Sequence, residues 1–151
     1  MDTETSAQSP AVRQFSIFLI NRAGALLSVV RLLEDAHVMV LALSLQDSVD
    51  VTVARLVVSD PETVETLFME RGIPFGCCDV LVVQLKDGAP GLSQCLTAFL
   101  QAETNIHFSY PLLVHPGGLS ALVLHLEDLE FGAAVMQKHG FRLLRQGDLS
   151  R

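Results

Sequence analysis

The stretch FSIFLINRAGALL, residues 15–27, contains the pattern from which the fold is predicted. Its first residues are apolar and rich in Phe and Ile, which is typical of a β-strand, and this run ends at Asn21. Gly24 follows, and from there to His37 apolar residues recur with the period of an amphipathic helix. The stretch therefore predicts a strand, a glycine turn and a helix in direct succession.

A second stretch of the same kind is VLVVQLKDGAPGLSQ, residues 80–94. Its Gly91 corresponds to Gly24, and the offset between the two glycines is 91 − 24 = 67. The same offset aligns the apolar run at 54–58 with the run at 121–125. The chain is therefore interpreted as a diverged tandem repeat of one unit.

Each of the two units, residues 12–79 and residues 80–151, is expected to contain the same order of elements, βαββαβ. In the first unit we expect strands at 12–20, 38–45 and 51–58, a long or double strand at 75–85, and helices at 24–37 and 61–71. In the second unit we expect helices at 91–103 and 128–139 and strands at 105–114, 119–126 and 141–145. This order is the ferredoxin-like arrangement, an α+β fold in which antiparallel sheets carry their helices on one face.

The ends and faces of the helices are also predicted. Asp60 is expected to cap the helix that starts at Pro61, where the missing N–H of proline costs nothing. In the helix at 91–103, the residues expected to face the core are Leu92, Leu96, Phe99 and Leu100. Helices cover only one face of each sheet, and the other face could be covered by the second sheet or by one continuous sheet extended edge to edge. Unpaired strand edges and bare apolar faces also favour a homodimer.

The composition excludes several classes of protein. Half of the 151 residues are apolar, the net charge is −7 and Lys and Arg do not cluster, so nucleic-acid binding is not expected. No apolar run approaches the ~18 residues that span a bilayer. Residues 1–11 are polar and acidic, which predicts a disordered tail rather than a signal peptide, and a cytoplasmic protein. Cys77, Cys78 and Cys95 are expected to be reduced, mostly packed thiols.

No catalytic or metal-binding pattern is recognised in the sequence. The histidines lack the spacing of metal sites and are expected to be at the surface or partly packed: His37, His107, His115, His125 and His139. Phosphate loops, nucleophile elbows and dinucleotide-binding glycine motifs are also missing. Catalytic residues, metal ions and cofactors are therefore not expected, and the protein is interpreted as a non-enzyme.

The two glycine turns are the candidate binding sites. The first turn of a helix leaves backbone N–H groups without intrahelical partners, in front of the positive end of the helix dipole. A glycine lets a ligand approach the backbone, because no Cβ stands in the way. Such a turn suits a small carboxylate, although a glycine there can also serve only to make a tight connection. Gly24→Val or Gly91→Val is expected to abolish binding at its own turn while the protein stays folded.

Three further segments accompany the repeat and its turns. They are RLVVSDP (residues 55–61), DVLVV (79–83) and TNI (104–106) followed by Tyr110. Together with the βαββαβ order and the turns NRAGAL (21–26) and DGAPGL (87–92), they make the chain similar to the ACT domain family, in particular to small proteins of two tandem ACT domains. The resemblance covers residues 13–149.

The resemblance implies a regulatory protein that binds a small molecule, most often an amino acid, at an interface between ACT units. In that family the ligand contacts come from the strand-to-helix loop and from the start of the second strand. Carried over to the first unit, the positions are Asn21, Arg22, Ala23, Gly24, Ala25, Leu26, Val38, Met39 and Val40. In the second unit they are Asp87, Ala89, Pro90, Gly91, Leu92, Asn105 and Ile106. Met39 stands where the family often has Asn, and Asp87-Gly88 replaces an Asn three residues before the glycine, so which unit binds is left open.

Three functions are compatible with this resemblance. The first is a free-standing amino-acid sensor that contacts another protein. The second is a regulatory subunit of a biosynthetic enzyme such as acetolactate synthase, whose small subunit also begins with an ACT domain. The third is a structural dimer without a ligand. A ligand screen separates the third function from the others, and co-purification with a catalytic chain separates the second from the first.

Overall fold

The computed structural model describes residues 9–20 and 24–150. Its strands are β1 (Val12–Ile20), β2 (Val40–Asp47), β3 (Val51–Val58), β4 (Phe75–Gln84), β5 (Ile106–Pro111), β6 (Ala121–Leu126) and β7 (Leu143–Leu144). Its helices are α2 (Ala25–Asp35), α3 (Pro61–Glu70), α4 (Pro90–Gln101), α5 (Leu129–Lys138) and α6 (Gln146–Leu149), with a short 3-10 turn η1 (Pro116–Gly118). The expected ligand contacts Asn21, Arg22 and Ala23, and most of the expected tail, lie outside the described residues.

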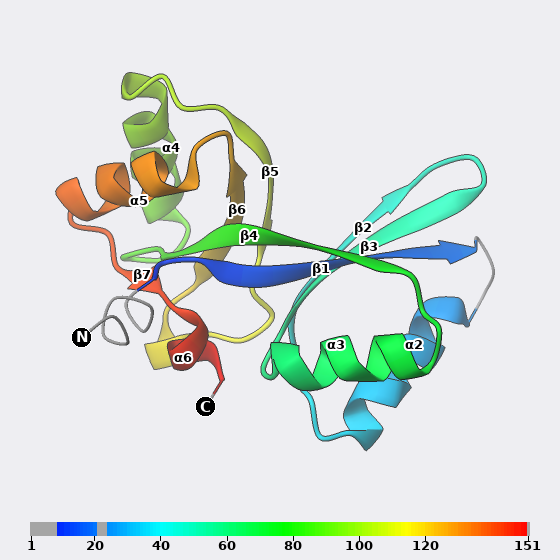
Figure 1. Cartoon of the computed structure of the whole chain (residues 1–151). Coiled ribbons are helices and arrows are strands. Elements are labelled where there is room, and N and C mark those ends of the chain that lie inside the picture. Colours follow the sequence, from blue (N-terminus) through cyan, green and yellow to red (C-terminus); the bar gives the residue numbers. More distant parts are fainter. Residues whose placement is uncertain (1–8, 21–23, 151) are drawn as a thin grey trace, which may run out of the picture.

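The seven described strands form one antiparallel sheet in the order β2-β3-β1-β4-β6-β5, with β7 paired to β4 (Figure 1). The long strand β4 joins the two repeats. Its first part, up to Val80, pairs with β1, and its second part, from Leu81, pairs with β6 and β7. The strand order is therefore β4-β1-β3-β2 in the first repeat and β7-β4-β6-β5 in the second, which is the ferredoxin-like order in both. The predicted α+β fold of two such units is confirmed.

Helices cover one face of the sheet in each repeat. Helices α2 and α3 pack on the first repeat, where the rings of Phe15, Phe68 and Phe75 form a cluster with centroids 5.7 to 5.9 Å apart. Helices α4 and α5 pack on the second repeat around Phe99 and Met136. The two helical layers lie at opposite ends of the molecule in Figure 1. Each repeat thus has its own helix-covered core.

The helix-free faces of the two repeats pack against each other. A third buried cluster joins Val12 of the first repeat to Tyr110 and Val123 of the second. The outer strand β2 also meets the segment that follows β5, where the amide of Leu113 donates to the carbonyl of Leu41 at 2.7 Å. The second repeat therefore covers much of the helix-free face of the first, within one continuous sheet.

A buried polar pair selects how the two repeats meet. The Tyr110 hydroxyl donates to Gln14 Oε1 at 2.6 Å, and Gln14 Nε2 donates to Cys78 Sγ at 3.2 Å. Burial raises the pKa of Tyr110, so its hydroxyl remains a neutral donor. Any other alignment of the two sheets would leave these polar groups unpaired in an apolar core, which is costly. The pair therefore favours one arrangement of the repeats.

Helix α4 differs from its prediction. Leu92, Leu96 and Leu100 are 38%, 41% and 77% exposed, whereas Cys95 and Phe99 are buried. The expectation that these leucines face the core was wrong, and only that for Phe99 is confirmed. The reason is that α4 contains no charged residue, so the periodicity cannot distinguish its two apolar faces. Packing against α5 and β4 decides which face is buried.

Two further predictions, the packing of the thiols and the last strand, differ in part from the structure. Cys95 is buried and Cys78 is half-buried, but Cys77 is exposed, and all three are free thiols. Burial raises the pKa of Cys95 to about 11, so this thiol stays protonated. The strand expected at 141–145 covers only 143–144 and is followed by the short helix α6.

Among the described residues, no helix has the length and apolar character needed to cross a membrane.

Candidate functional site

The first glycine turn connects the end of β1 to the start of α2. Gly24 precedes the helix with a φ of 89°, a left-handed conformation that glycine adopts without strain. Its carbonyl accepts hydrogen bonds from the amide and the hydroxyl of Ser28, at 2.9 and 3.0 Å. Gly24 has no side chain to cap the helix, and the first turn of α2 carries no acidic residue. The positive end of α2 is therefore not neutralised by a carboxylate of its own.

A cavity of about 520 Å³ lies in front of this turn, between the end of β1, the start of α2 and the segment before β4. Its lining residues are Phe18, Leu19, Ile20, Gly24, Ala25, Ser28, Val29, Gly72, Ile73 and Pro74. None of these residues is charged, and only Ser28 has a polar side chain. The volume and the lining suit a small, mostly apolar molecule.

Helices α3 and α5 begin differently from α2. Asp60 accepts a hydrogen bond from the amide of Thr63 at 3.2 Å, as expected for a cap, and Asp128 accepts one from the amide of Phe131 at 3.0 Å. Hydrogen bonds from the Thr63 hydroxyl and amide hold the pKa of Asp60 below its ordinary value, so this carboxylate stays charged. Because α3 and α5 carry their own anion at the N-terminus, α2 is the better place for an external carboxylate.

The second glycine turn is closed. Helix α4 begins at Pro90, so Gly91 lies inside the helix, where it is buried. A Cβ at this position would collide with the carbonyl oxygen of Lys86, and the Gly91 amide already donates to the carbonyl of Gly88 at 3.0 Å. The Lys86 carbonyl thus occupies the space that a ligand would need, and the Gly91 amide is already hydrogen-bonded within the turn.

A single offset of 67 does not align the two turns. Helices α2 and α4 begin at residues 25 and 90, an offset of 65, whereas α3 and α5 begin at 61 and 129, an offset of 68. The counterpart of Gly24 is therefore Ala89, the residue before α4, rather than Gly91. The repeat is real, but its connections differ in length.

The expected contacts at the second strand do not meet the glycine turn within one chain. Val40, at the start of β2, pairs with Val58 at one end of β3, whereas Ile20, beside the turn, pairs with Val51 at the other end. The two pairs are 58 − 51 = 7 residues apart on β3, a distance of about 23 Å along a strand. A ligand at the first turn would reach the start of β2 only in a second copy of the chain.

Several expected contacts have other partners. Val38 is buried in the core of the first repeat, and the amide of the half-exposed Met39 donates to the Ser59 hydroxyl at 2.9 Å. In the second repeat, Asn105 donates to the Glu127 carboxylate at 3.2 Å. Leu26 packs against the helix-covered core of the first repeat, and Ile106 against that of the second. Exposed around the closed turn are Asp87, Ala89, Pro90 and Leu92.

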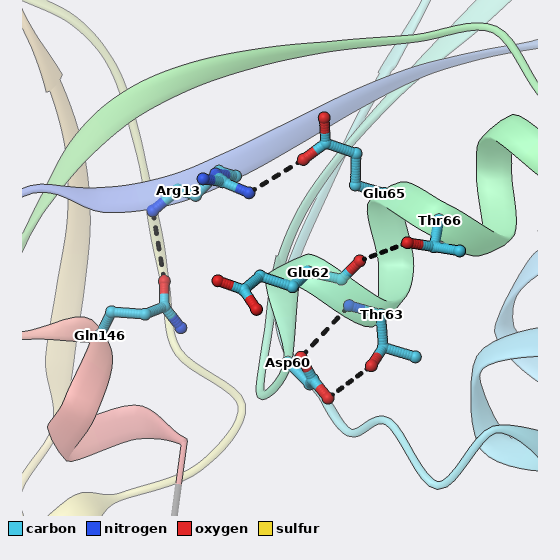
Figure 2. A network of polar contacts seen from close by, with 7 residues as sticks. All are labelled: Arg13, Asp60, Glu62, Thr63, Glu65, Thr66 and Gln146. Carbon is cyan, nitrogen blue, oxygen red and sulfur yellow. Dashed lines mark hydrogen bonds and ion pairs between the residues drawn. The ribbon is translucent and has the colours of Figure 1, made fainter.

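A second cavity, of about 540 Å³, lies where α6 meets the first repeat. Figure 2 shows the polar contacts beside it: Arg13 Nη1 is 3.1 Å from Glu65 Oε2, and the Arg13 amide donates to Gln146 Oε1 at 3.3 Å. Gln146 Nε2 also donates to the carbonyl of Val58 at 3.2 Å. The carboxylates in the lining are Asp60, Glu62 and Asp79. This negative charge opposes an anionic ligand, and the contacts instead hold α6 against the first repeat.

The contact that holds α6 against the first repeat beside this second cavity was not predicted from the sequence. The contact of Arg13 with Gln146 joins positions 133 residues apart. No local pattern marks either residue, because such a contact depends on how the two repeats are packed rather than on the neighbouring sequence.

Solved structures of other proteins share this fold. Protein BT0572 from Bacteroides thetaiotaomicron is 21% identical over 94% of this chain and 97% of that chain, with a TM-score of 0.85. The ligand-free regulatory subunit of aspartate kinase from Thermus thermophilus is 12% identical over 86% and 93% of the two chains, with a TM-score of 0.62. A structure of aspartokinase alpha and beta subunits is 14% identical over 86% and 93%, with a TM-score of 0.58. Identities this low show a common fold alone.

The sequence itself identifies the family. A search of curated proteins gave no match. Residues 10–151, however, match the family described as the ACT domain pair. The match includes both glycine turns and every described strand, in agreement with the two ferredoxin-like units of the structure. The chain therefore belongs to the ACT domain pair family.

Proposed function

We propose that this protein is a regulatory sensor of a small amino acid whose side chain is apolar or uncharged. The observation that carries the proposal is the cavity of about 520 Å³ in front of the uncapped start of α2, whose described lining carries no charge. Backbone amides at a helix N-terminus bind carboxylates, and an apolar lining suits an aliphatic side chain. By the family resemblance, Asn21, Arg22 and Ala23 belong to the same proposed site.

The ligand is placed with its carboxylate at the first turn of α2 and its side chain against Val29, Ile73 and Pro74. Its ammonium group stays hydrated at the rim, which the exposed side chains of Phe18 and Ile20 form. An ionised side chain would lose its hydration against a described lining that offers no opposite charge. Amino acids with basic side chains, which the charge of Arg22 also disfavours, are therefore not proposed as ligands.

The ligand signal is proposed to pass to another protein in the cytoplasm. No catalytic constellation is recognised in the sequence, so the sensor is proposed to be a non-enzyme that acts through a regulated enzyme or a regulator protein. A subunit of an amino-acid biosynthetic enzyme is the second candidate, favoured by the fold shared with the regulatory subunit of an aspartate kinase. Co-purification of a catalytic chain would support the second candidate. A structural dimer without a ligand is the third.

Thermal unfolding against each of the twenty amino acids at millimolar concentration tests the sensor. A ligand present at about 100 times its Kd stabilises the folded state by roughly 2.7 kcal/mol. For a chain of this length that gain raises the melting temperature by about 5–10 °C. We expect such a rise with one or a few related apolar or uncharged amino acids and none with basic ones. No rise with any amino acid would contradict the free-standing sensor and leave the partner-dependent subunit or the structural dimer.

A homodimer is proposed to form through α4. Leu92, Leu96 and Leu100 are spaced four residues apart, so their exposed side chains form one ridge along the helix. No residue of α4 is charged, although the chain carries a net charge of −7. Two acidic copies repel each other least at an uncharged surface. A ridge of this spacing also packs against its own copy across a twofold axis.

Leu96→Glu is expected to convert the dimer to a monomer. The substitution places a carboxylate in the middle of the ridge and, by twofold symmetry, opposite its own copy, where it must be desolvated without a partner. Sedimentation equilibrium measures the change. Met69→Glu on α3 is the control, because Met69 is an apolar residue that is 69% exposed outside the ridge, and this variant should stay dimeric. A monomeric parent protein, or a dimeric Leu96→Glu variant, would exclude this interface.

A further inference from the structure

His107 and His125 lie side by side on neighbouring strands. His107 is on β5 and His125 on β6, and their Nδ1 atoms are 3.1 Å apart. The pairing of the two strands shifts register between Ile106 and Phe108, so His107 occupies a β-bulge. A bulge redirects a side chain, and bulges are over-represented beside functional sites. Both imidazoles remain accessible, because His107 is exposed and His125 is half-buried.

The ring of His125 is stacked on a ring of its own repeat, which in turn contacts an arginine of the other repeat. Phe108 stacks on it with ring centroids 4.7 Å apart and an angle of 6° between the planes. The guanidinium carbon of Arg55, on β3, lies 4.1 Å from the centroid of the Phe108 ring. Arg55 in turn donates to Gln46 Oε1 at 3.0 Å. The stack limits rotation of the His125 ring and keeps its Nδ1 directed at His107.

We propose that His107 and His125 bind one divalent transition-metal ion of the imidazole-preferring class, such as Zn²⁺, through their Nδ1 atoms. A metal bound at about 2.0–2.1 Å by two imidazoles separates their nitrogens by about 2.9–3.4 Å, for bond angles from square to tetrahedral. The observed separation of 3.1 Å lies within this interval, so small ring movements suffice. Neutral imidazole is also a ligand of choice for zinc, copper and nickel.

The proposed site holds its ion with two side chains. Among the described residues, no group of three His, Cys, Asp or Glu is placed to share a metal ion. The carboxylate of Glu127, two residues after His125, accepts a hydrogen bond from the side-chain amide of Asn105. Water or an exchangeable ligand therefore completes the coordination, unlike the closed four-residue shell of a structural zinc site. Occupancy of the site then depends on the metal concentration. This inference does not depend on the amino-acid cavity.

Calorimetric titration of the full chain with ZnCl₂ at neutral pH tests the site. We expect one ion per chain, and a loss of affinity of roughly 100-fold in His107→Gln or His125→Gln, because either change leaves one imidazole where two acted together. His139→Gln removes an unpaired exposed histidine and should change nothing. Mg²⁺, which prefers oxygen ligands, should not bind.

Two comparisons separate loss of the proposed site from zinc binding by sulfur and from unfolding. Cys77→Ser removes the exposed thiol, and zinc binding that is lost in this variant but kept in His107→Gln would assign the metal to sulfur and overturn the proposal. His107 is exposed, so His107→Gln should unfold at the same temperature as the parent without metal even if His125→Gln does not. Zinc affinity unchanged in His107→Gln, or no zinc binding by the parent chain, would mean that the pair is only a hydrogen bond between two neighbouring rings.

Discussion

Gly24→Val is expected to abolish the rise in melting temperature that the amino-acid ligand causes. Apart from the residues next to Gly24 in the chain, no described residue lies within 4 Å of a Cβ at this position, so the added side chain has room among the described residues. It would, however, stand in front of the first turn of α2, where the ligand carboxylate is placed. A loss of binding removes the whole stabilisation, about 2.7 kcal/mol at a ligand concentration of 100 times Kd. Thermal unfolding with and without the ligand measures the effect.

Gly118→Val is the matched control for this substitution. Gly118 has a φ of 79°, close to the 89° of Gly24, and a Cβ there also meets nothing within 4 Å. Both variants therefore carry the strain of a β-branched residue in a left-handed conformation, and both should unfold at a lower temperature than the parent without ligand. Only Gly24→Val should lose the response to the ligand. An equal response in the two variants would show that the ligand binds elsewhere.

Gly91→Val is expected to destabilise the fold rather than remove a ligand. The added Cβ collides with the carbonyl oxygen of Lys86, which is backbone and can move only if the turn before α4 moves. Overpacking of this kind costs about 1–3 kcal/mol, and at a backbone contact we expect the upper end. For this length of chain the melting temperature should fall by about 5–10 °C. Thermal unfolding without ligand measures the loss.

Gly147→Val separates the collision from the general cost of placing valine in a helix. Gly147 and Gly91 are both the second residue of their helices, but a Cβ at Gly147 meets nothing within 4 Å. Gly147→Val should therefore keep nearly the parent melting temperature. If Gly91→Val were equally stable and lost the ligand response instead, the second turn would be the binding site and our assignment of the cavity at α2 would be wrong.

Gly24 and Gly91 also show where prediction from the sequence succeeds and where it fails. The sequence pattern correctly places a glycine turn before the first helix, because that signal depends on neighbouring residues. It also pairs Gly24 with Gly91, and this equivalence fails because the connections of the two repeats differ in length. A single offset cannot detect such a difference. The distinction between an open turn and a closed one depends on the Lys86 carbonyl, whose position is a property of the folded loop.

The helix faces give a second example. On α3, Asp60 and Pro61 predict the start of the helix, and the spacing of Val64, Leu67 and Phe68 predicts its inner face. The structure confirms the start and buries Val64 and Phe68, whereas Leu67 is only partly buried. On α4, apolar residues occur on both faces and charges are missing, so the sequence cannot select the buried face. Packing against α5 buries Cys95 and Phe99 there and leaves the leucine ridge exposed. That ridge is now the proposed dimer interface.

The sequence by itself determined the elements, their order in two repeats and the membership of a family, because hydrophobic period, caps and turn residues act over a few positions. Only the tertiary structure decided which glycine turn is open, that the helix-free faces cover each other, and that Tyr110 meets Gln14 and His107 meets His125. These contacts join residues 96 and 18 positions apart. They depend on strand register and on the packing of one sheet against another, and neither leaves a signal in the neighbouring sequence.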